Sequence, residues 1–301
     1  MMTQLSTQTL LVTGGSGQLG RRVIDLLLEA NAGHVITTTR TPEKLADLAA
    51  RGVEVRPGDF DQPDSLATVF AGVDRLLLIS TDELAEPGKR LAQHRNAVAA
   101  AVKAGVKHVV YTSLVKPEPG SPITFAGDHY GTEQALAESP LDWTILRNNV
   151  YTEMLLMSLP PAIASGHLMA AAGDGGVGYV TREDCARAAA AALAANTSGR
   201  ATLDITGPEV VTFADLAQIA SEISGRPVNY VSVATEDMVA GMIRAGLPPF
   251  LAEAMVSFHT AAAQGDHGFT TSAVADLTGT APQSVRDFLL AHREALAASP
   301  A

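Results

Sequence analysis

Three evenly spaced glycines are the residues of this chain best placed to do chemistry. Gly14, Gly17 and Gly20 follow an apolar run at residues 9–13 and precede an amphipathic segment. A strand, a glycine-rich turn and a helix in this order bring backbone N–H groups and a helix N-terminus together, where a pyrophosphate can bind. Glycines also make ordinary turns, but this context favours a dinucleotide site. The turn residues expected to contact the nucleotide are Gly14, Gly15, Ser16, Gly17, Gln18 and Leu19.

Two cations follow the second apolar run, residues 34–39. Arg40 lies about twenty residues after Gly20, where an acidic residue would bind the ribose 2′-OH of NAD. A guanidinium instead holds a 2′-phosphate through paired charge-assisted hydrogen bonds. Lys44 lies one helical turn further on. These cations predict NADPH (NADP) as the cofactor, with a solvated charged loop as the alternative.

The ends of later apolar runs carry further polar residues. Asp59 could accept a hydrogen bond from the adenine amino group while Phe60 packs beside the ring, although a plain turn aspartate is equally consistent. Ser80 ends the run at residues 75–80, and Thr112 and Ser113 end the run at 107–113. Their hydroxyls could anchor the nicotinamide carboxamide or the substrate, or cap the strand ends.

Apolar runs alternate with helical periodicity through the first half of the chain, which predicts an α/β fold: a Rossmann-type doubly wound parallel sheet. We expect an NADP-binding domain at residues 1–150, with 177–207 returning to it. Residues 151–176 and 208–301 are expected to form a smaller, mostly helical substrate-binding region. The expected sheet strands in the first half are residues 9–13, 34–39, 53–56, 75–80, 107–113 and 143–147.

Composition narrows the class of protein. The net charge is −11 and no basic cluster interrupts it, so nucleic acid is not an expected partner. The single cysteine, Cys185, allows no intramolecular disulfide. No metal-ligand spacing, signal peptide or membrane-spanning run is present, so we expect a cytoplasmic monomer or homodimer without a metal.

Several motifs, in order along nearly the whole chain, resemble one family. They include Thr13-Gly-Gly-Ser-Gly-Gln-Leu-Gly20, Gly58-Asp-Phe60, Tyr111-Thr-Ser113, Leu146-Arg-Asn148 and Val180-Thr-Arg-Glu-Asp184. Together they resemble the NmrA-like branch of the atypical short-chain dehydrogenases, and within it the type 2 NAD(P)H:quinone oxidoreductases and triphenylmethane dye reductases. The resemblance implies an NAD(P)H-dependent oxidoreductase.

The chain departs from ordinary short-chain dehydrogenases, in which a Tyr-x-x-x-Lys pair transfers the proton. Four residues after Tyr130 stands Gln134, and the same predicted helix carries His129 and Glu133. A ketone becomes an alkoxide on reduction and needs a positioned acid, whereas a quinone becomes a stabilised anion and a cationic dye becomes neutral. The resemblance and the missing pair together predict direct hydride transfer, without flavin, to a quinone or similar conjugated aromatic acceptor.

Three residues are candidates for the catalytic site: His129, Tyr151 and Ser113. His129 could donate a proton to a quinone oxygen, or could form a helix-surface pair with Glu133. Arg147 is expected to tie the domains together. The alternative function is a non-catalytic NADP(H)-binding redox sensor or regulator of the NmrA type, which also lacks the Tyr–Lys pair. A further possibility is an isomerase or reductase that uses the same cofactor on another substrate.

Overall fold

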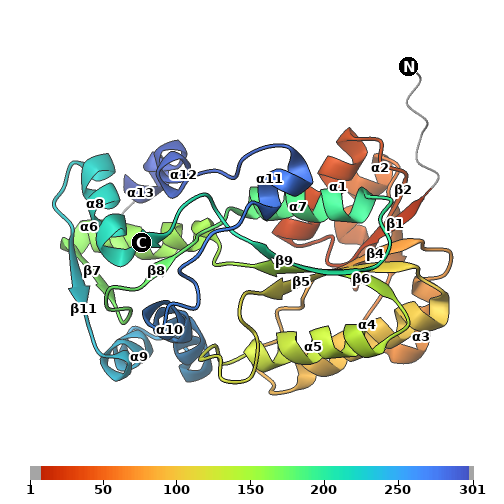
Figure 1. The fold of residues 1–301 in the computed structure, drawn as a ribbon, viewed down its shortest axis with the longest axis horizontal. Coiled ribbons are helices and arrows are strands. Elements are labelled where there is room, and N and C mark those ends of the chain that lie inside the picture. The colour runs from red at the N-terminus through yellow and green to blue at the C-terminus, as the bar shows by residue number, and fades with distance from the viewer. Residues whose placement is uncertain (1–7, 298–301) are drawn as a thin grey trace. The chain divides into compact units, whose positions relative to one another are not determined.

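The computed structural model describes residues 8–297 and divides the chain into two compact units (Figure 1). Unit 1 consists of Met1–Ser113, Asp128–Arg147 and Cys185–Leu203, and unit 2 of Leu114–Gly127, Asn148–Asp184 and Asp204–Ala301. The predicted division at residue 150 therefore differs in detail from the observed one. The segment 114–127 groups with unit 2, and of the range 177–207 only 185–203 groups with unit 1.

A seven-stranded sheet forms the centre of the Rossmann-type fold, in the order β3-β2-β1-β4-β5-β6-β9. The strands are β1 (Thr9–Val12), β2 (His34–Thr39), β3 (Glu54–Pro57), β4 (Arg75–Leu78), β5 (His108–Leu114), β6 (Asp142–Asn148) and β9 (Arg200–Ile205). The pairs β1–β2, β1–β4, β2–β3 and β4–β5 are parallel. The strand order reverses between β1 and β4, and this is where doubly wound sheets bind their ligands. The predicted fold class is confirmed.

Helices cover both faces of this sheet (Figure 1). One face carries α1 (Gln18–Glu29) and α7 (Arg182–Ala194), and the other carries α3 (Pro63–Val69), α4 (Lys89–Ala104) and α5 (Ala126–Glu138). The short helices η1 (Pro42–Leu45) and α2 (Ala46–Ala50) connect β2 to β3. Because both faces are covered, β4 and β5 are buried along their whole length, as their unbroken apolar runs indicate.

Helix α1 packs through a face that includes one of the turn glycines. Its buried residues are Gly20, Val23, Ile24 and Leu27. A glycine in this face lets the first turn of the helix lie close against the glycine-rich turn that precedes it. The position of α1 over β1 therefore depends on the same glycines that form the turn.

Buried Arg75, at the start of β4, holds the end of α7. Its guanidinium donates hydrogen bonds to the carbonyl oxygens of Ala192, Leu193 and Thr197, at 3.1, 2.8 and 2.9 Å. A cation at a helix C-terminus satisfies carbonyls that lack a helical partner and complements the helix dipole. These hydrogen bonds hold the C-terminal end of α7 against the start of β4.

Unit 2 is mostly helical. Its elements are η2 (Thr152–Met154), α6 (Leu155–Ser165), β7 (His167–Ala170), β8 (Gly176–Val177), β10 (Val211–Thr212), α8 (Phe213–Ser224), β11 (Asn229–Ser232), α9 (Thr235–Arg244), α10 (Pro249–Ala263), α11 (Ala273–Thr278), α12 (Val285–Ala291) and α13 (Arg293–Ala297). Strand β11 pairs in parallel with β7, and β10 pairs antiparallel with β8. An apolar core joins α6, α8 and α12, with Leu159, Leu216 and Leu289 among its buried residues.

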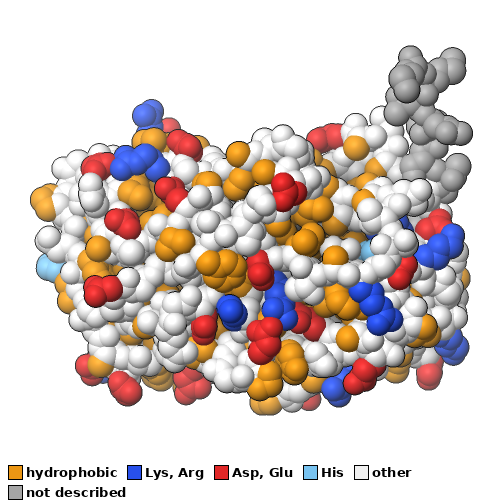
Figure 2. All heavy atoms as spheres, viewed as in Figure 1, with side chains coloured by type: hydrophobic (Ala, Val, Ile, Leu, Met, Phe, Trp, Pro, Cys, Tyr) orange, Lys and Arg blue, Asp and Glu red, His pale blue; other side chains and the backbone are white. Residues whose placement is uncertain are grey.

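Charged side chains of both signs are mixed on the surface. Figure 2 shows Lys and Arg side chains scattered among acidic ones on the face that it draws. Within residues 8–297, no helix combines the length and the apolar character needed to cross a bilayer. Cys185 is buried and, as the single cysteine of the sequence, forms no intramolecular disulfide.

Candidate active site

The glycine turn adopts a geometry that side chains would block. Gly14 has φ +65°, in the left-handed region, and its carbonyl oxygen accepts a 2.9 Å hydrogen bond from the N–H of Gly17. A Cβ on Gly20 would lie 2.4 Å from that carbonyl oxygen, and one on Gly15 would lie 2.1 Å from Oγ1 of Thr37. The turn therefore needs glycine at these positions for close packing of helix against strand.

The N-terminus of α1 follows this turn and carries no capping side chain. Gly17 occupies the N-cap position, and no acidic residue lies in the first turn of the helix. The first N–H groups of a helix have no partner within it, and its dipole adds positive potential there. Such a terminus beside a glycine cradle suits the pyrophosphate of a dinucleotide, and the turn residues Ser16, Gln18 and Leu19 lie in it.

The two cations predicted to bind the 2′-phosphate follow β2, the strand that pairs with β1. Arg40 follows β2 directly and is exposed, and Lys44 is exposed in η1. Strand β2 pairs with β1, with Thr37 opposite Val12. Both cations therefore lie at the edge of the sheet where the glycine turn lies, with side chains accessible to a ligand.

Asp59 and Phe60 follow β3 and have contacts of their own. The Asp59 carboxylate accepts a 3.0 Å hydrogen bond from the N–H of Asp61, as in a turn. Phe60 is half-buried against the core of unit 1, and its carbonyl oxygen accepts a 2.9 Å hydrogen bond from Asn96. The turn role of Asp59 exists without a ligand, and its contact with adenine stays a prediction.

Hydroxyl groups tie together the carboxyl ends of β1, β4 and β5. Oγ1 of Thr13 accepts a hydrogen bond from the N–H of Ile79, and Oγ1 of Thr112 accepts one from the N–H of Ser80, both at 2.9 Å. The buried Thr112 therefore holds the segment after β4 in place. Three neighbouring strand ends are fixed beside the glycine turn.

Ser113 takes part in a buried cluster that its position in the sequence does not reveal. Its hydroxyl donates a 2.7 Å hydrogen bond to Oε1 of Glu133 on α5. Arg147 on β6 binds the same carboxylate in a bidentate pair. Its Nε donates to Oε1 at 2.9 Å and its Nη2 donates to Oε2 at 2.6 Å. Arg147 thus joins α5 to β6 inside unit 1, and Glu133 is buried rather than on a helix surface.

His129 lies in the interior of unit 1 and is 3% exposed. Its Nε2 lies 2.9 Å from Nη2 of Arg90, and its Nδ1 lies 2.9 Å from the hydroxyl of Tyr111. Burial, and secondarily the charge of Arg90, lowers the pKa of His129 well below its usual value. The ring is therefore neutral and engaged inside the fold, and the surface pair with Glu133 is a wrong expectation because neither side chain reaches the surface.

A second buried histidine extends this cluster towards the sheet edge. Nε2 of His94 accepts a 3.0 Å hydrogen bond from the N–H of Thr81, so its Nδ1 proton points to Oγ1 of Thr132 at 2.9 Å. Burial lowers the pKa of His94 to about 3. Sequence reasoning missed this arrangement, because residues on α4, α5 and β5 meet only in the folded chain.

Tyr151 belongs to unit 2 and is half-buried. Its hydroxyl accepts a 3.2 Å hydrogen bond from the side-chain amide of Asn148, and the guanidinium of Arg182 lies 5.3 Å from its ring centroid. The amide thus contacts the hydroxyl of Tyr151, and the guanidinium lies over the face of its ring. Of its apolar neighbours, Leu155 belongs to the core, whereas Met157 is 65% exposed and available to a ligand.

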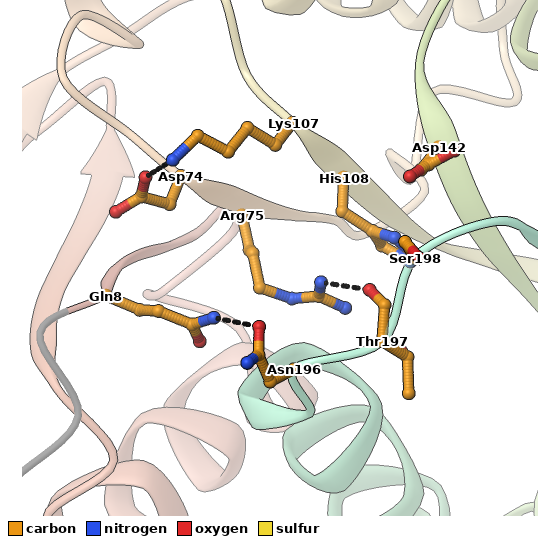
Figure 3. A pocket seen from close by; sticks show the side chains of 9 residues that line it. All are labelled: Gln8, Asp74, Arg75, Lys107, His108, Asp142, Asn196, Thr197 and Ser198. Carbon is orange, nitrogen blue, oxygen red and sulfur yellow. Dashed lines mark hydrogen bonds and ion pairs between the residues drawn. The ribbon is translucent and has the colours of Figure 1, made fainter.

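A cavity of about 530 Å³ lies at the amino edge of the seven-stranded sheet, where the strands begin (Figure 3). It is lined by the residues that begin β4, β5 and β6, namely Arg75, His108 and Asp142. Figure 3 shows two of its cations already bound: Lys107 to Asp74, and Arg75 to Thr197. Because parallel sheets bind cofactors at their carboxyl edge, this amino-edge cavity is not the nucleotide site.

The fold and site define a Rossmann-type dinucleotide-binding protein. A model of an NAD(P)H-binding family matches residues 14–196, and the chain belongs to this family. The chain is 37% identical over 255 residues to quinone oxidoreductase 2 of Escherichia coli, which covers 84% of this chain and 88% of the relative. The resemblance to NmrA-like reductases is thereby confirmed.

Two solved structures are similar over almost their full length. The NADPH complex of an NADPH-dependent quinone oxidoreductase from Escherichia coli has a TM-score of 0.89 and 34% identity, covering 94% of this chain and 99% of that one. The triphenylmethane reductase of a Citrobacter species, in complex with NADP(H), has a TM-score of 0.86 and 36% identity, covering 95% of this chain and 99% of that one.

Among residues 8–297, no cluster of His, Cys, Asp or Glu could hold a metal ion.

Proposed function

We propose that this protein is an NADPH-dependent reductase that transfers hydride directly to a quinone or a similar conjugated aromatic acceptor, without a Tyr–Lys pair. The chain is an NAD(P)H-dependent oxidoreductase, and its relatives include reductases of quinones and of triphenylmethane dyes. The observation that carries the proposal is the glycine cradle and uncapped N-terminus of α1, with Arg40 exposed one strand away.

The nucleotide contacts follow from this arrangement. The N–H groups at the start of α1 would hold the pyrophosphate, and Arg40 with Lys44 would hold the 2′-phosphate. Asp59 and Phe60 would border the adenine. Ser80, Thr112 and Ser113 lie at the ends of β4 and β5, on the side of the strand-order reversal where the nicotinamide is expected.

The chemistry of the acceptor suits the residues that the chain offers. When bound, NADPH supplies the hydride. Helix α5 presents no lysine four residues after Tyr130 to activate a phenol as an acid. A quinone can accept hydride without prior protonation, because the anion that forms is delocalised, and positioning then supplies much of the rate. Tyr151 is our candidate for the group that hydrogen-bonds the acceptor oxygen.

The roles of the other two candidate residues differ from that of Tyr151. The buried, neutral ring of His129 lies against the hydroxyl of Tyr111 on β5, inside the core of unit 1. Ser113 directs its proton to Glu133. Both residues therefore act on the shape of the site more than on the acceptor's proton.

Steady-state assays test this proposal. Purified protein, shown to be free of flavin by its absorption spectrum, is mixed with NADPH and a panel of quinones, triphenylmethane dyes and conjugated carbonyl compounds. We expect NADPH oxidation with at least one quinone, and a slower reaction with NADH. Tight NADPH binding without turnover on every acceptor would favour the redox-sensor alternative and would contradict the reductase.

A further inference from the structure

The cluster of Ser113, Glu133 and Arg147 has a fixed direction of hydrogen bonding. Arg147 carries only donors and binds both oxygens of the Glu133 carboxylate, so that carboxylate acts as an acceptor. The 2.7 Å contact from Ser113 to Oε1 must therefore use the single proton of the serine hydroxyl. Ser113 keeps only oxygen lone pairs for any other partner.

The surroundings hold this direction firmly. Ser113 is 4% exposed and Glu133 is 5% exposed, so water competes little for either group. The strand end that carries Ser113 is also fixed, since neighbouring Thr112 is bonded to the segment after β4. Turning the serine proton away would remove one of the two donors of Oε1 and set the lone pairs of the serine against a buried carboxylate, which costs free energy.

We propose that Glu133, held by Arg147, is a positioning residue that makes Ser113 an obligatory hydrogen-bond acceptor, and that Ser113 thereby selects the amide N–H of the nicotinamide carboxamide. This inference rests on the proposed function, because it assigns Ser113 to the cofactor. It also excludes Ser113 as the acid that protonates the acceptor, although an exposed serine at the same strand end could serve as one.

Equilibrium binding separates this role from a structural one. The probes are NADP⁺ and 3-acetylpyridine adenine dinucleotide phosphate, in which a methyl group replaces the amide nitrogen and only the carbonyl acceptor remains. Wild-type protein should bind NADP⁺ roughly three- to tenfold more tightly than the analogue, the usual range for one hydrogen bond. Ser113→Ala should weaken binding of NADP⁺ and leave binding of the analogue unchanged.

The double variant Glu133→Leu/Arg147→Met removes the ion pair without leaving a buried charge unpaired. The hydroxyl of Ser113 can then rotate and donate to the acetyl carbonyl, so the analogue should bind more tightly than it does to wild type. A merely structural pair would instead weaken both ligands together. Glu138→Gln, an exposed carboxylate on the same helix, is the matched control and should keep the wild-type ratio.

Three results would overturn the proposal: equal affinity of wild type for both probes, an unchanged ratio in Ser113→Ala, or a parallel loss of both ligands in the double variant. Circular dichroism and thermal melting check folding. If the double variant does not fold, Ser113→Ala still decides whether the serine accepts a hydrogen bond from the carboxamide N–H. Wild-type protein that binds NADP⁺ without preference refutes this inference alone, whereas absence of NADP⁺ binding refutes the proposed function.

Discussion

The guanidinium of Arg90 donates a hydrogen bond to Nε2 of His129 across 2.9 Å. Because arginine has no acceptor, this contact fixes the tautomer of the histidine and leaves its ring proton on Nδ1, 2.9 Å from the hydroxyl of Tyr111. Burial and the nearby positive charge both lower the pKa of His129. A neutral ring inside the fold is a poor source of protons for a substrate.

Replacing His129 should therefore affect stability more than chemistry. We expect His129→Ala to lower the free energy of unfolding by roughly 2–4 kcal/mol, because it leaves a cavity and removes buried hydrogen bonds. The turnover number of the folded fraction should fall less than about tenfold, well short of the effect of losing a general acid. Chemical denaturation and quinone-dependent NADPH oxidation measure the two effects. A loss of several orders of magnitude with unchanged stability would instead make His129 a catalytic acid.

Arg40 is expected to distinguish the two nicotinamide nucleotides. Arg40→Ala should weaken NADPH binding by roughly 1.5–3 kcal/mol, since a charge-assisted contact to the 2′-phosphate is lost. Binding of NADH, which lacks that phosphate, should change little. Titration calorimetry with both nucleotides measures this, with Arg95→Ala, an exposed arginine on α4, as the control. Equal losses for both nucleotides would show that Arg40 does not contact the phosphate.

The glycine turn should not tolerate a methyl group at Gly20. Gly20→Ala places a Cβ 2.4 Å from the Gly14 carbonyl oxygen, so helix α1 must shift and its N–H groups lose their alignment. We expect nucleotide affinity to fall by more than about a hundredfold, or roughly 2.7 kcal/mol. In the control Gly241→Ala, the closest contact of the new Cβ is 3.9 Å, to the flexible end of Arg244. Wild-type affinity in Gly20→Ala would be inconsistent with a close-packed turn.

Tyr151 is the residue that we propose as hydrogen-bond partner of the acceptor oxygen. Tyr151→Phe should lower the turnover number with quinones by roughly tenfold, below the usual range for acid–base catalysis because the product anion is stabilised. The KM for NADPH should not change. Tyr130→Phe, at the position next to the usual dyad tyrosine, is the matched control and should keep wild-type rates. A loss of turnover in Tyr130→Phe but not in Tyr151→Phe would instead make Tyr130 the functional phenol.

Buried histidines should make the fold sensitive to mild acid. Burial lowers the pKa of His267 to about 4, from the usual 6.5. As the pH falls from 6.5 to 4, the unfolded chain takes up the proton first, so the free energy of unfolding falls across this window. Each such ring contributes up to about 3 kcal/mol to the change.

The variant His267→Leu should flatten the dependence of unfolding free energy on pH between 6.5 and 4. Urea denaturation at a series of pH values measures the slope, and His167→Gln, an exposed histidine, is the control. An identical slope in His267→Leu and wild type would mean that the ring is protonated in the folded protein. His108, whose pKa burial also lowers to about 4, contributes to the same window.

The local pattern of the sequence was enough to predict the cofactor fold. A glycine turn between a strand and a helix is a short-range feature, so its residues and spacing predict α1 and β1 directly. The unbroken apolar runs of β4 and β5 likewise predict strands buried on both faces. The sequence alone also established that no lysine follows Tyr130 at the dyad spacing.

Only the tertiary structure decided which polar side chains meet. Glu133 and His129 are one helical turn apart, and their spacing suggested a pair, yet the fold joins Glu133 to Arg147 and His129 to Arg90. Partners on separate elements come together through the packing of helices against the sheet, and no periodicity in the chain encodes that choice. The direction of hydrogen bonding at Ser113 therefore depends on residues far from it in the sequence.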